Sequence, residues 1–235
     1  MSHIVGIVGL GMVGGAMAQS FLSRKIPLKV YDKYKDEGVG CLSDLLCTDI
    51  VFLALPTPFV EETKEYLTLG IEETCSFLQA HKYSGIVVIK STVTPGTIYR
   101  LERIFSSLNF VHNPEFLTAR TALDDFESQV QIVLGKGKKD FSLSKLIAFY
   151  ESFYPMSKIS FCSAVESELM KLGTNCFYAT KVEYFTELYL LCCKIGADYE
   201  TVRQLMLNNG WIRKDHTTVP GPDGKISYGG LCFTK

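Results

Sequence analysis

The stretch Ile4-Val-Gly-Ile-Val-Gly9-Leu-Gly11-Met-Val-Gly14 decides the fold. Its first residues form a short apolar run that predicts a strand, and a helix is predicted to follow from Met12. The glycines between them have the spacing G-x-G-x-x-G. Gly9 permits a tight turn, Gly11 lets the backbone approach a pyrophosphate, and Gly14 allows the helix to pack closely on the strand. The stretch therefore predicts a dinucleotide site at the N-terminus of the helix, where free amides and positive potential favour phosphate.

An acidic residue further on indicates which dinucleotide binds. Asp32 ends the second predicted strand, and a carboxylate there accepts hydrogen bonds from the adenosine ribose hydroxyls and repels a 2′-phosphate. NAD is therefore favoured over NADP, although Lys33 next to it would soften that preference. We expect Met12 and Val13, between the glycines, to contact the cofactor too. The alternatives are glycines that serve only a tight turn, and an FAD site, which nothing else in the chain supports.

The first part of the chain alternates short apolar runs with helix-like segments. Several runs are rich in Val and Ile, and none has the in/out alternation of a half-exposed strand, as expected for parallel strands covered on both faces. The predicted strands are Ile4–Val8, Leu28–Tyr31, Ile50–Leu55, Gly85–Ile89, Asn109–His112, Gln129–Leu134 and Lys158–Phe161. The helices predicted between them are Met12–Arg24, Glu61–His81, Pro95–Ser106 and Asp140–Phe153. This alternation predicts an α/β fold with a doubly wound, Rossmann-type parallel sheet.

The residue pattern changes at about Ala164. Apolar residues over Ala164–Ile195 recur at spacings of three and four, which predicts one long helix ending before Gly196. A second helix, Asp198–Asn208, begins with an acidic cap. A loop rich in Pro and Gly then leads to Cys232. We predict an NAD-binding domain over residues 1–162, and a long central helix with a small helical domain over residues 163–235.

The composition excludes several classes of protein. Hydrophobic residues make up 47% of the chain and charged residues 21%, with a net charge of −1. Without a basic run, nucleic acid is not an expected partner. Neither a membrane span nor a signal sequence is recognisable, so we expect a cytoplasmic protein. The eight cysteines have no C-x-x-C pair, so we expect neither a metal site nor a disulfide framework, and Cys232 alone is singled out below.

Four further segments carry a resemblance to a known family. They are Leu55-Pro-Thr-Pro58, Ser91-Thr-Val-Thr-Pro-Gly-Thr97, Asn113-Pro-Glu-Phe-Leu117 and the run from Val219 to Lys235, and the long helix adds Glu168, Lys171 and Asn175. Together with the glycine turn, they resemble the UDP-glucose/GDP-mannose dehydrogenase family, and most of all its UDP-glucose branch, over nearly the whole chain. The resemblance implies NAD as cofactor, with Pro56, Thr57 and Thr92 in contact with it, and a nucleotide sugar as substrate.

The resemblance also implies a reaction, the oxidation of UDP-glucose at C6 to UDP-glucuronate by two hydride transfers. The alcohol becomes an aldehyde, a cysteine captures it, hydride loss gives a thioester, and water releases the acid. Cys232 would be the nucleophile, Lys171 and Asn175 would polarise the oxyanion, and Glu115 would be the general acid/base. Thr92 would orient water or cofactor. Without the resemblance, Cys232 would be interpreted as a buried cysteine, and Lys171 and Asn175 as part of a solvated helix face. Glu115 would then be a surface glutamate and Thr92 a helix cap.

The same resemblance implies the surroundings of the substrate and the assembly. Phe116 and Leu117 would line the sugar pocket, beside Glu115, Lys171 and Asn175. Tyr228 and Gly229 would belong to the substrate loop. A helix of about 30 residues is roughly 45 Å long, more than one Rossmann domain covers. We therefore predict a homodimer in which the long helix pairs with its mate, as the family resemblance implies.

The sequence also departs from the family pattern. Members normally continue with an aspartate four residues after the cysteine and with a C-terminal α/β domain, whereas this sequence ends at Lys235. We expect either a fragment or a compact, divergent member. Lys225-Ile-Ser-Tyr228 also replaces the usual Lys-Arg-Gly-Phe. Two other functions stay open: a β-hydroxyacid dehydrogenase of the 3-hydroxyisobutyrate type, which needs no cysteine, and an NAD-binding subunit without turnover.

Overall fold

The chain forms two compact units. The computed structural model describes residues 3–222 and 224–229. Unit 1 is Met1–Lys171 and unit 2 is Leu172–Lys235. Among the described residues, none of the helices has the combination of length and hydropathy that a membrane span needs.

Unit 1 is built on one sheet of seven strands in the order β2-β1-β3-β6-β7-β8-β9. All seven predicted strands are present, with ends that differ by at most two residues. They are β1 Val5–Val8, β2 Leu28–Tyr31, β3 Ile50–Leu53, β6 Ile86–Ile89, β7 Asn109–His112, β8 Gln131–Lys136 and β9 Lys158–Ser163. The fully buried strands β1, β3 and β6 explain why those runs lack alternation.

The sheet is mostly parallel, as the predicted fold class requires, and only one pairing departs from this. The strand β8 runs antiparallel to β7 and pairs with it only through Val111↔Lys136 and His112↔Gly135. A parallel pairing would need a crossover across the sheet. The connection from β7 to β8 instead carries one short helix, α4 Ala122–Glu127, which the sequence analysis did not predict and which is only about 9 Å long.

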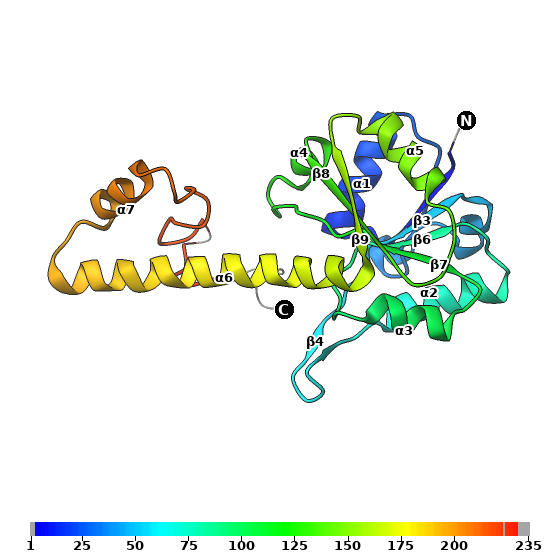
Figure 1. Cartoon of the computed structure of the whole chain (residues 1–235), viewed down its shortest axis with the longest axis horizontal. Coiled ribbons are helices and arrows are strands. Elements are labelled where there is room, and N and C mark those ends of the chain that lie inside the picture. Colours follow the sequence, from blue (N-terminus) through cyan, green and yellow to red (C-terminus); the bar gives the residue numbers. More distant parts are fainter. Residues whose placement is uncertain (1–2, 223, 230–235) are drawn as a thin grey trace. The chain divides into compact units, whose positions relative to one another are not determined.

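Helices cover both faces of the sheet, so the doubly wound α/β prediction is confirmed (Figure 1). On one face lie α1 Met12–Ser23, α4 and α5 Ser144–Phe153, around a core that contains Phe21, Phe52 and Phe149. On the other lie α2 Leu69–Ala80 and α3 Thr97–Ile104. Between β2 and β3 the chain forms only the short 3-10 helices η1 Lys35–Glu37 and η2 Leu42–Cys47.

Three predicted helix starts are wrong: the helix predicted from Asp140 begins at Ser144, and the other two differ for local reasons. The helix predicted from Glu61 begins at Leu69, because β4 Phe59–Val60 and β5 Glu65–Tyr66 form a hairpin in which the two aromatic rings pack edge to face at 5.5 Å. The helix predicted from Pro95 begins at Thr97. Gly96 between them has φ +96°, a left-handed conformation that cannot belong to the helix.

The helices of unit 2 agree with the prediction. The long helix α6 is Ala164–Ile195, and its first turns belong to unit 1. The next helix, α7 Tyr199–Asn208, is capped by Asp198, whose carboxylate accepts a hydrogen bond from the Thr201 amide at 2.7 Å. A small core contains Phe185, Cys192 and Tyr199. This core holds α7 against the second half of α6.

Candidate functional site

The glycine turn between β1 and α1 has the geometry that its spacing predicts. Gly9 has φ +88°, and a side chain there would lie 2.5 Å from the Ala54 carbonyl oxygen. A side chain on Gly14 would lie 1.8 Å from the Gly9 carbonyl oxygen. One on Gly11 would meet nothing within 4 Å. Gly9 and Gly14 are therefore required by the protein itself, whereas Gly11 leaves open space for a ligand.

The carboxylate of Asp32 is already bound to the backbone around the turn. It accepts hydrogen bonds from the amides of Leu10 at 2.7 Å, Tyr34 at 2.9 Å and Lys35 at 3.0 Å. Burial by itself would raise the pKa of Asp32, but these bonds outweigh it and hold the pKa below its usual range. A carboxylate has about four acceptor positions, so Asp32 keeps capacity for a ribose hydroxyl. The neighbouring Lys33 is exposed and pairs with Glu73 at 3.5 Å.

A depression in the surface lies directly against this turn. Gly11 and Met12 line it at the start of α1, Lys35 lines it after β2, and Ala119 and Arg120 line it before α4. The remaining lining residues are Leu10, Gly15, Ala16, Gln19, Ala122 and Leu123. The open space at Gly11, the free helix N-terminus and the lysine and arginine fit the phosphates of a dinucleotide. Val13 lies within the first turn of α1.

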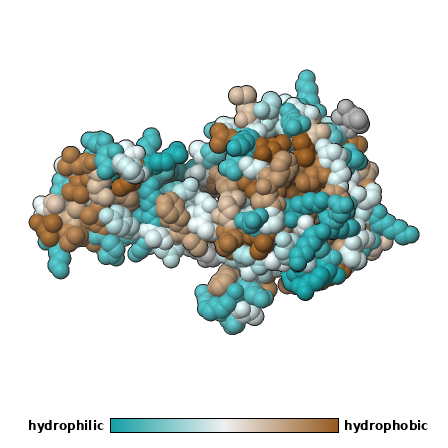
Figure 2. Space-filling model, viewed as in Figure 1, coloured by the Kyte–Doolittle hydropathy of each residue, from teal (hydrophilic) through white to brown (hydrophobic). Residues whose placement is uncertain are grey.

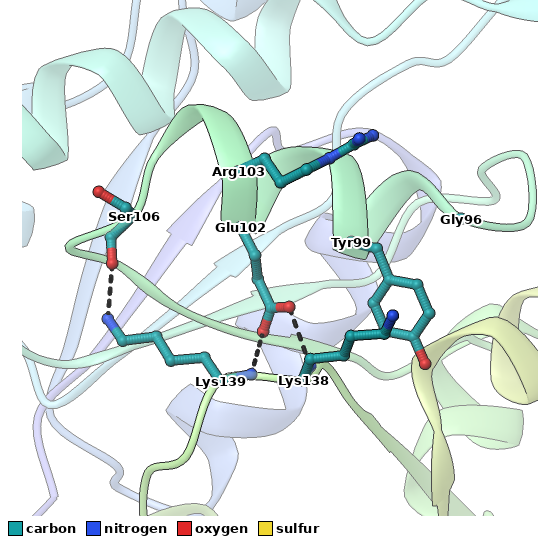
Figure 3. Close-up of a pocket in the computed structure, with 7 residues that line it drawn as sticks. All are labelled: Gly96, Tyr99, Glu102, Arg103, Ser106, Lys138 and Lys139. Atoms are coloured by element: carbon teal, nitrogen blue, oxygen red, sulfur yellow. Dashed lines mark hydrogen bonds between the residues drawn. The ribbon is translucent and has the colours of Figure 1, made fainter.

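A second depression of unit 1, beside α3, is less suited to a ligand (Figure 3). Its carboxylate, Glu102, accepts hydrogen bonds from the amides of Lys138 at 2.9 Å and Lys139 at 3.2 Å. The ammonium of Lys139 donates to three carbonyls, including that of Ser106 at 2.9 Å. These charges are satisfied by the loop and the helix end, and so they stabilise the fold.

The other predicted site residues of unit 1 follow strands β3, β6 and β7. Pro56 is exposed after β3, and the buried hydroxyl of its neighbour Thr57 donates to the Thr92 carbonyl at 2.7 Å. Thr92 follows β6 and is buried. Because the carboxyl ends of parallel strands meet at one edge, these loops lie at the edge where doubly wound sheets bind ligands.

A buried ion pair occupies this edge. The carboxylate of Glu115, in the loop after β7, lies 3.0 Å from the ammonium of Lys171, and the two side chains are only 6% and 5% exposed. The other oxygen of Glu115 accepts from the Leu117 amide at 2.6 Å. The ring centre of Phe116 lies 5.7 Å from the Lys171 nitrogen. Neither charged residue belongs to a solvated surface. A buried ion pair between this loop and α6 can stabilise an oxyanion or transfer a proton.

Next to this pair lies a buried lysine that the sequence analysis missed. Lys90, 2% exposed at the end of β6, donates to the Asn113 side-chain oxygen at 3.0 Å, and Tyr150 donates to that same oxygen at 2.5 Å. Burial lowers the pKa of Lys90 to about 7, although Glu115 opposes the shift. A lysine that ends the apolar run Ile86–Ile89 was the signal that could have revealed it.

The start of α6 is bound to the same edge by two more buried side chains. Ser167 is hydrogen-bonded to His112 Nδ1 at 2.8 Å. Burial lowers the pKa of His112 to about 3, so this histidine is neutral near pH 7. Glu168 accepts from the amides of Gly96 at 2.6 Å and Ile98 at 2.8 Å, which caps α3 from outside. Burial raises the pKa of Glu168, although the two amides oppose the shift.

The remaining predicted site residues belong to unit 2 or lie beyond the described residues. Asn175 is buried and follows Lys171 by one turn of α6. Tyr228 and Gly229 lie in the loop after α7, which is bound to α6 where Ser227 donates to Glu183 at 2.8 Å. Cys232, the predicted nucleophile, lies outside the described residues.

Two family models match the chain, and both belong to one family. The UDP-glucose/GDP-mannose dehydrogenase family, NAD binding domain, matches residues 41–154, and the central domain of that family matches residues 165–235. The chain belongs to the UDP-glucose/GDP-mannose dehydrogenase family. The predicted resemblance is therefore confirmed, and so is the prediction of NAD as the cofactor of its first domain.

Curated relatives of the family resemble this chain over only part of their length. A UDP-glucose 6-dehydrogenase of Rhizobium meliloti (strain 1021) is 32% identical over 200 residues, which covers 80% of this chain and 44% of the relative. One of Rickettsia bellii (strain RML369-C) is 31% identical over 215 residues, again with 44% of the relative covered. The chain thus spans less than half the length of these relatives.

Solved structures confirm the fold. A UDP-glucose dehydrogenase from Pyrobaculum islandicum superposes with a TM-score of 0.82 at 22% identity, over 99% of this chain and 62% of that one. A 3-hydroxyisobutyrate dehydrogenase from Mycobacterium tuberculosis superposes with a TM-score of 0.71 at 17% identity, over 96% and 78%. The fold is therefore common to both enzyme classes that the sequence left open.

Proposed function

We propose that this chain is the cofactor-binding and catalytic part of an enzyme that oxidises UDP-glucose at C6 to UDP-glucuronate. The observation that carries the proposal is the buried Glu115–Lys171 pair at the carboxyl edge of the NAD-binding sheet. An unpaired buried charge is costly, and a purely structural position could be filled by apolar side chains. A carboxylate and an ammonium held together beside a dinucleotide site suit repeated proton transfer at a reacting carbon.

Each oxidation needs a hydride acceptor, and NAD bound at the glycine turn supplies it. The ammonium of Lys171 would stabilise the oxygen at C6 as negative charge develops there. Glu115 would take the proton from the water that cleaves the thioester. The roles of Asn175 and of Cys232, whose thiolate would add to the aldehyde, enter through the family resemblance alone. The sum is one alcohol, two NAD and one water converted to one carboxylate, two NADH and three protons.

The stoichiometry of NADH tests this proposal. The natural protein is expected to form two NADH for each UDP-glucose consumed, measured by absorbance at limiting UDP-glucose. The variant Cys232→Ala should form no UDP-glucuronate, because no thioester can form. The exposed Cys41 offers a matched control, since Cys41→Ala should leave the ratio at two.

Other outcomes would indicate the other functions. One NADH for each molecule of a small β-hydroxyacid, with none from UDP-glucose, would contradict the proposal and indicate a 3-hydroxyisobutyrate-type dehydrogenase. Binding of NAD by calorimetry without turnover of either substrate would indicate a non-catalytic subunit.

We further propose that the protein is a homodimer through α6. Phe177, Tyr184 and Leu191 follow one another at seven-residue spacing along α6 and are 63%, 56% and 51% exposed. A seven-residue repeat places the three side chains on one face of the helix. Figure 2 shows apolar surface in brown on unit 2. An exposed apolar stripe on a helix favours burial against a second copy of the same stripe.

Light scattering tests the dimer. The wild type is expected to have twice the mass of one chain, and Tyr184→Glu together with Leu191→Glu should halve it, because charge would be buried in the interface. Leu205→Glu, on the exposed side of α7, is the matched control and should leave the mass unchanged. A wild type that is monomeric at high concentration would contradict the proposal.

A further inference from the structure

An arginine without a partner lies at the edge of the cofactor depression. Arg120 is exposed in the loop between β7 and α4 and lines the depression together with Gly11 and Met12. Within residues 3–222 and 224–229, no hydrogen bond or ion pair engages its guanidinium. The loop is fixed on both sides of Arg120, since Asp125 accepts from the Thr118 amide at 2.7 Å and the Thr121 hydroxyl at 2.9 Å. Arg120 is therefore a free cation on an anchored loop.

The two charged side chains that line the depression are both cations. Lys35 lines it from the side of β2, and its ammonium contacts the Leu10 carbonyl at 3.2 Å. The helix α1 contributes its N-terminus, with no capping side chain and no acidic residue in its first turn. The nearby carboxylate of Asp32 is bound by three backbone amides and does not line the depression. Two cations and a helix N-terminus thus face one open space.

We infer that Arg120 binds the pyrophosphate of NAD from the side opposite the glycine turn. This inference rests on the proposed cofactor site, and it adds a residue that neither the glycine spacing nor the acidic residue indicates. A guanidinium presents its donors in a planar fork that matches two oxygens of a phosphate. The amides of the first turn of α1 would hold one side of the pyrophosphate and Arg120 the other. Lys35 would add attraction without the same geometry.

Calorimetry with matched variants tests this role. Arg120→Ala is expected to weaken binding of NAD and of ADP by about 10- to 100-fold, because charged hydrogen bonds to phosphate are lost. Binding of adenosine, which has no phosphate, should stay the same. Arg120→Lys should recover part of the affinity, since it restores charge but not the fork. The slope of log Kd against log salt should fall for Arg120→Ala.

The control is another exposed arginine of unit 1. Arg103 borders the separate depression beside α3 (Figure 3), so Arg103→Ala changes the net charge equally and should leave NAD binding unchanged. Thermal unfolding of each variant checks that the fold is intact. The inference would be overturned if both substitutions weakened NAD binding equally, or if Arg120→Ala did not weaken it. Neither result would contradict NAD binding by the wild type.

The outcome also separates this inference from the proposed reaction. A wild type that binds NAD through Arg120 but forms no NADH from UDP-glucose would refute the reaction and leave the role of Arg120 in place. A wild type that binds neither NAD nor ADP would refute both.

Discussion

Replacing Gly14 by alanine is expected to destabilise unit 1 by about 3 kcal/mol and to abolish NAD binding. The added carbon would lie 1.8 Å from the Gly9 carbonyl oxygen, which is backbone and cannot turn aside. The start of α1 must then move away from β1, and the proposed cofactor turn would move with it. Each kcal/mol lowers the melting temperature of a domain of this size by roughly 2–4 °C. Thermal unfolding and calorimetry measure both effects.

Two other glycines serve as matched controls. Gly11→Ala should unfold at the wild-type temperature, because nothing lies within 4 Å of the added carbon, yet it should bind NAD more weakly because the carbon occupies the space for pyrophosphate. Gly70→Ala, in the first turn of α2, meets only the Leu55 side chain at 3.6 Å and should change neither property. If Gly11→Ala bound NAD as tightly as the wild type, the depression beside it would not be the cofactor site.

Replacing Lys171 by methionine is expected to cost about 3–5 kcal/mol of unfolding free energy and to slow NADH formation by several orders of magnitude. Glu115 would remain buried, 6% exposed, with the Leu117 amide but without its ammonium partner. The loss of rate follows from the proposed role of Lys171 in the transition state, so NAD binding should change little. Urea unfolding, calorimetry and NADH absorbance separate the three quantities.

A double-mutant cycle distinguishes the pair from its individual members. Glu115→Gln removes the opposite charge, and the double variant with Lys171→Met should regain most of the stability lost by Lys171→Met alone, because no uncompensated charge stays buried. Its activity should not return. Recovery of both stability and turnover would mean that the pair is structural, and the proposed catalytic role would be wrong.

The sequence predicted best those features that depend on local pattern. Seven strands and the whole of α6 follow from short apolar runs and from a helical period, both of which neighbouring residues determine. The glycine turn and Asp32 were found because their spacing is tied to one backbone geometry. The wrong helix start at Glu61 also comes from local pattern. The residues after Glu61 have a helical pattern, but Phe59 pairs with Tyr66 in a hairpin that this pattern does not indicate.

Contacts between distant segments could not be predicted in this way. In sequence Lys90 stands out only for following an apolar strand, and its hydrogen-bond network depends on Asn113 and Tyr150, which are 23 and 60 residues away. Arg120 stands in a polar loop like any surface arginine, and only the fold brings it beside Gly11. The antiparallel pairing of β8 with β7 joins segments more than 20 residues apart, and no local residue pattern encodes it.

The beginning of α6 constrains how this fold can be recombined. Within two turns it supplies a hydroxyl to His112, a carboxylate to the start of α3 and an ammonium to Glu115, from Ser167, Glu168 and Lys171. A chimera that joined the strands of this chain to the helix of a homologue would keep the buried charges balanced only with the same three groups at the same three positions. The strands of unit 1 and the start of α6 therefore have to come from the same parent protein. This holds even though the boundary between the two compact units lies just after Lys171.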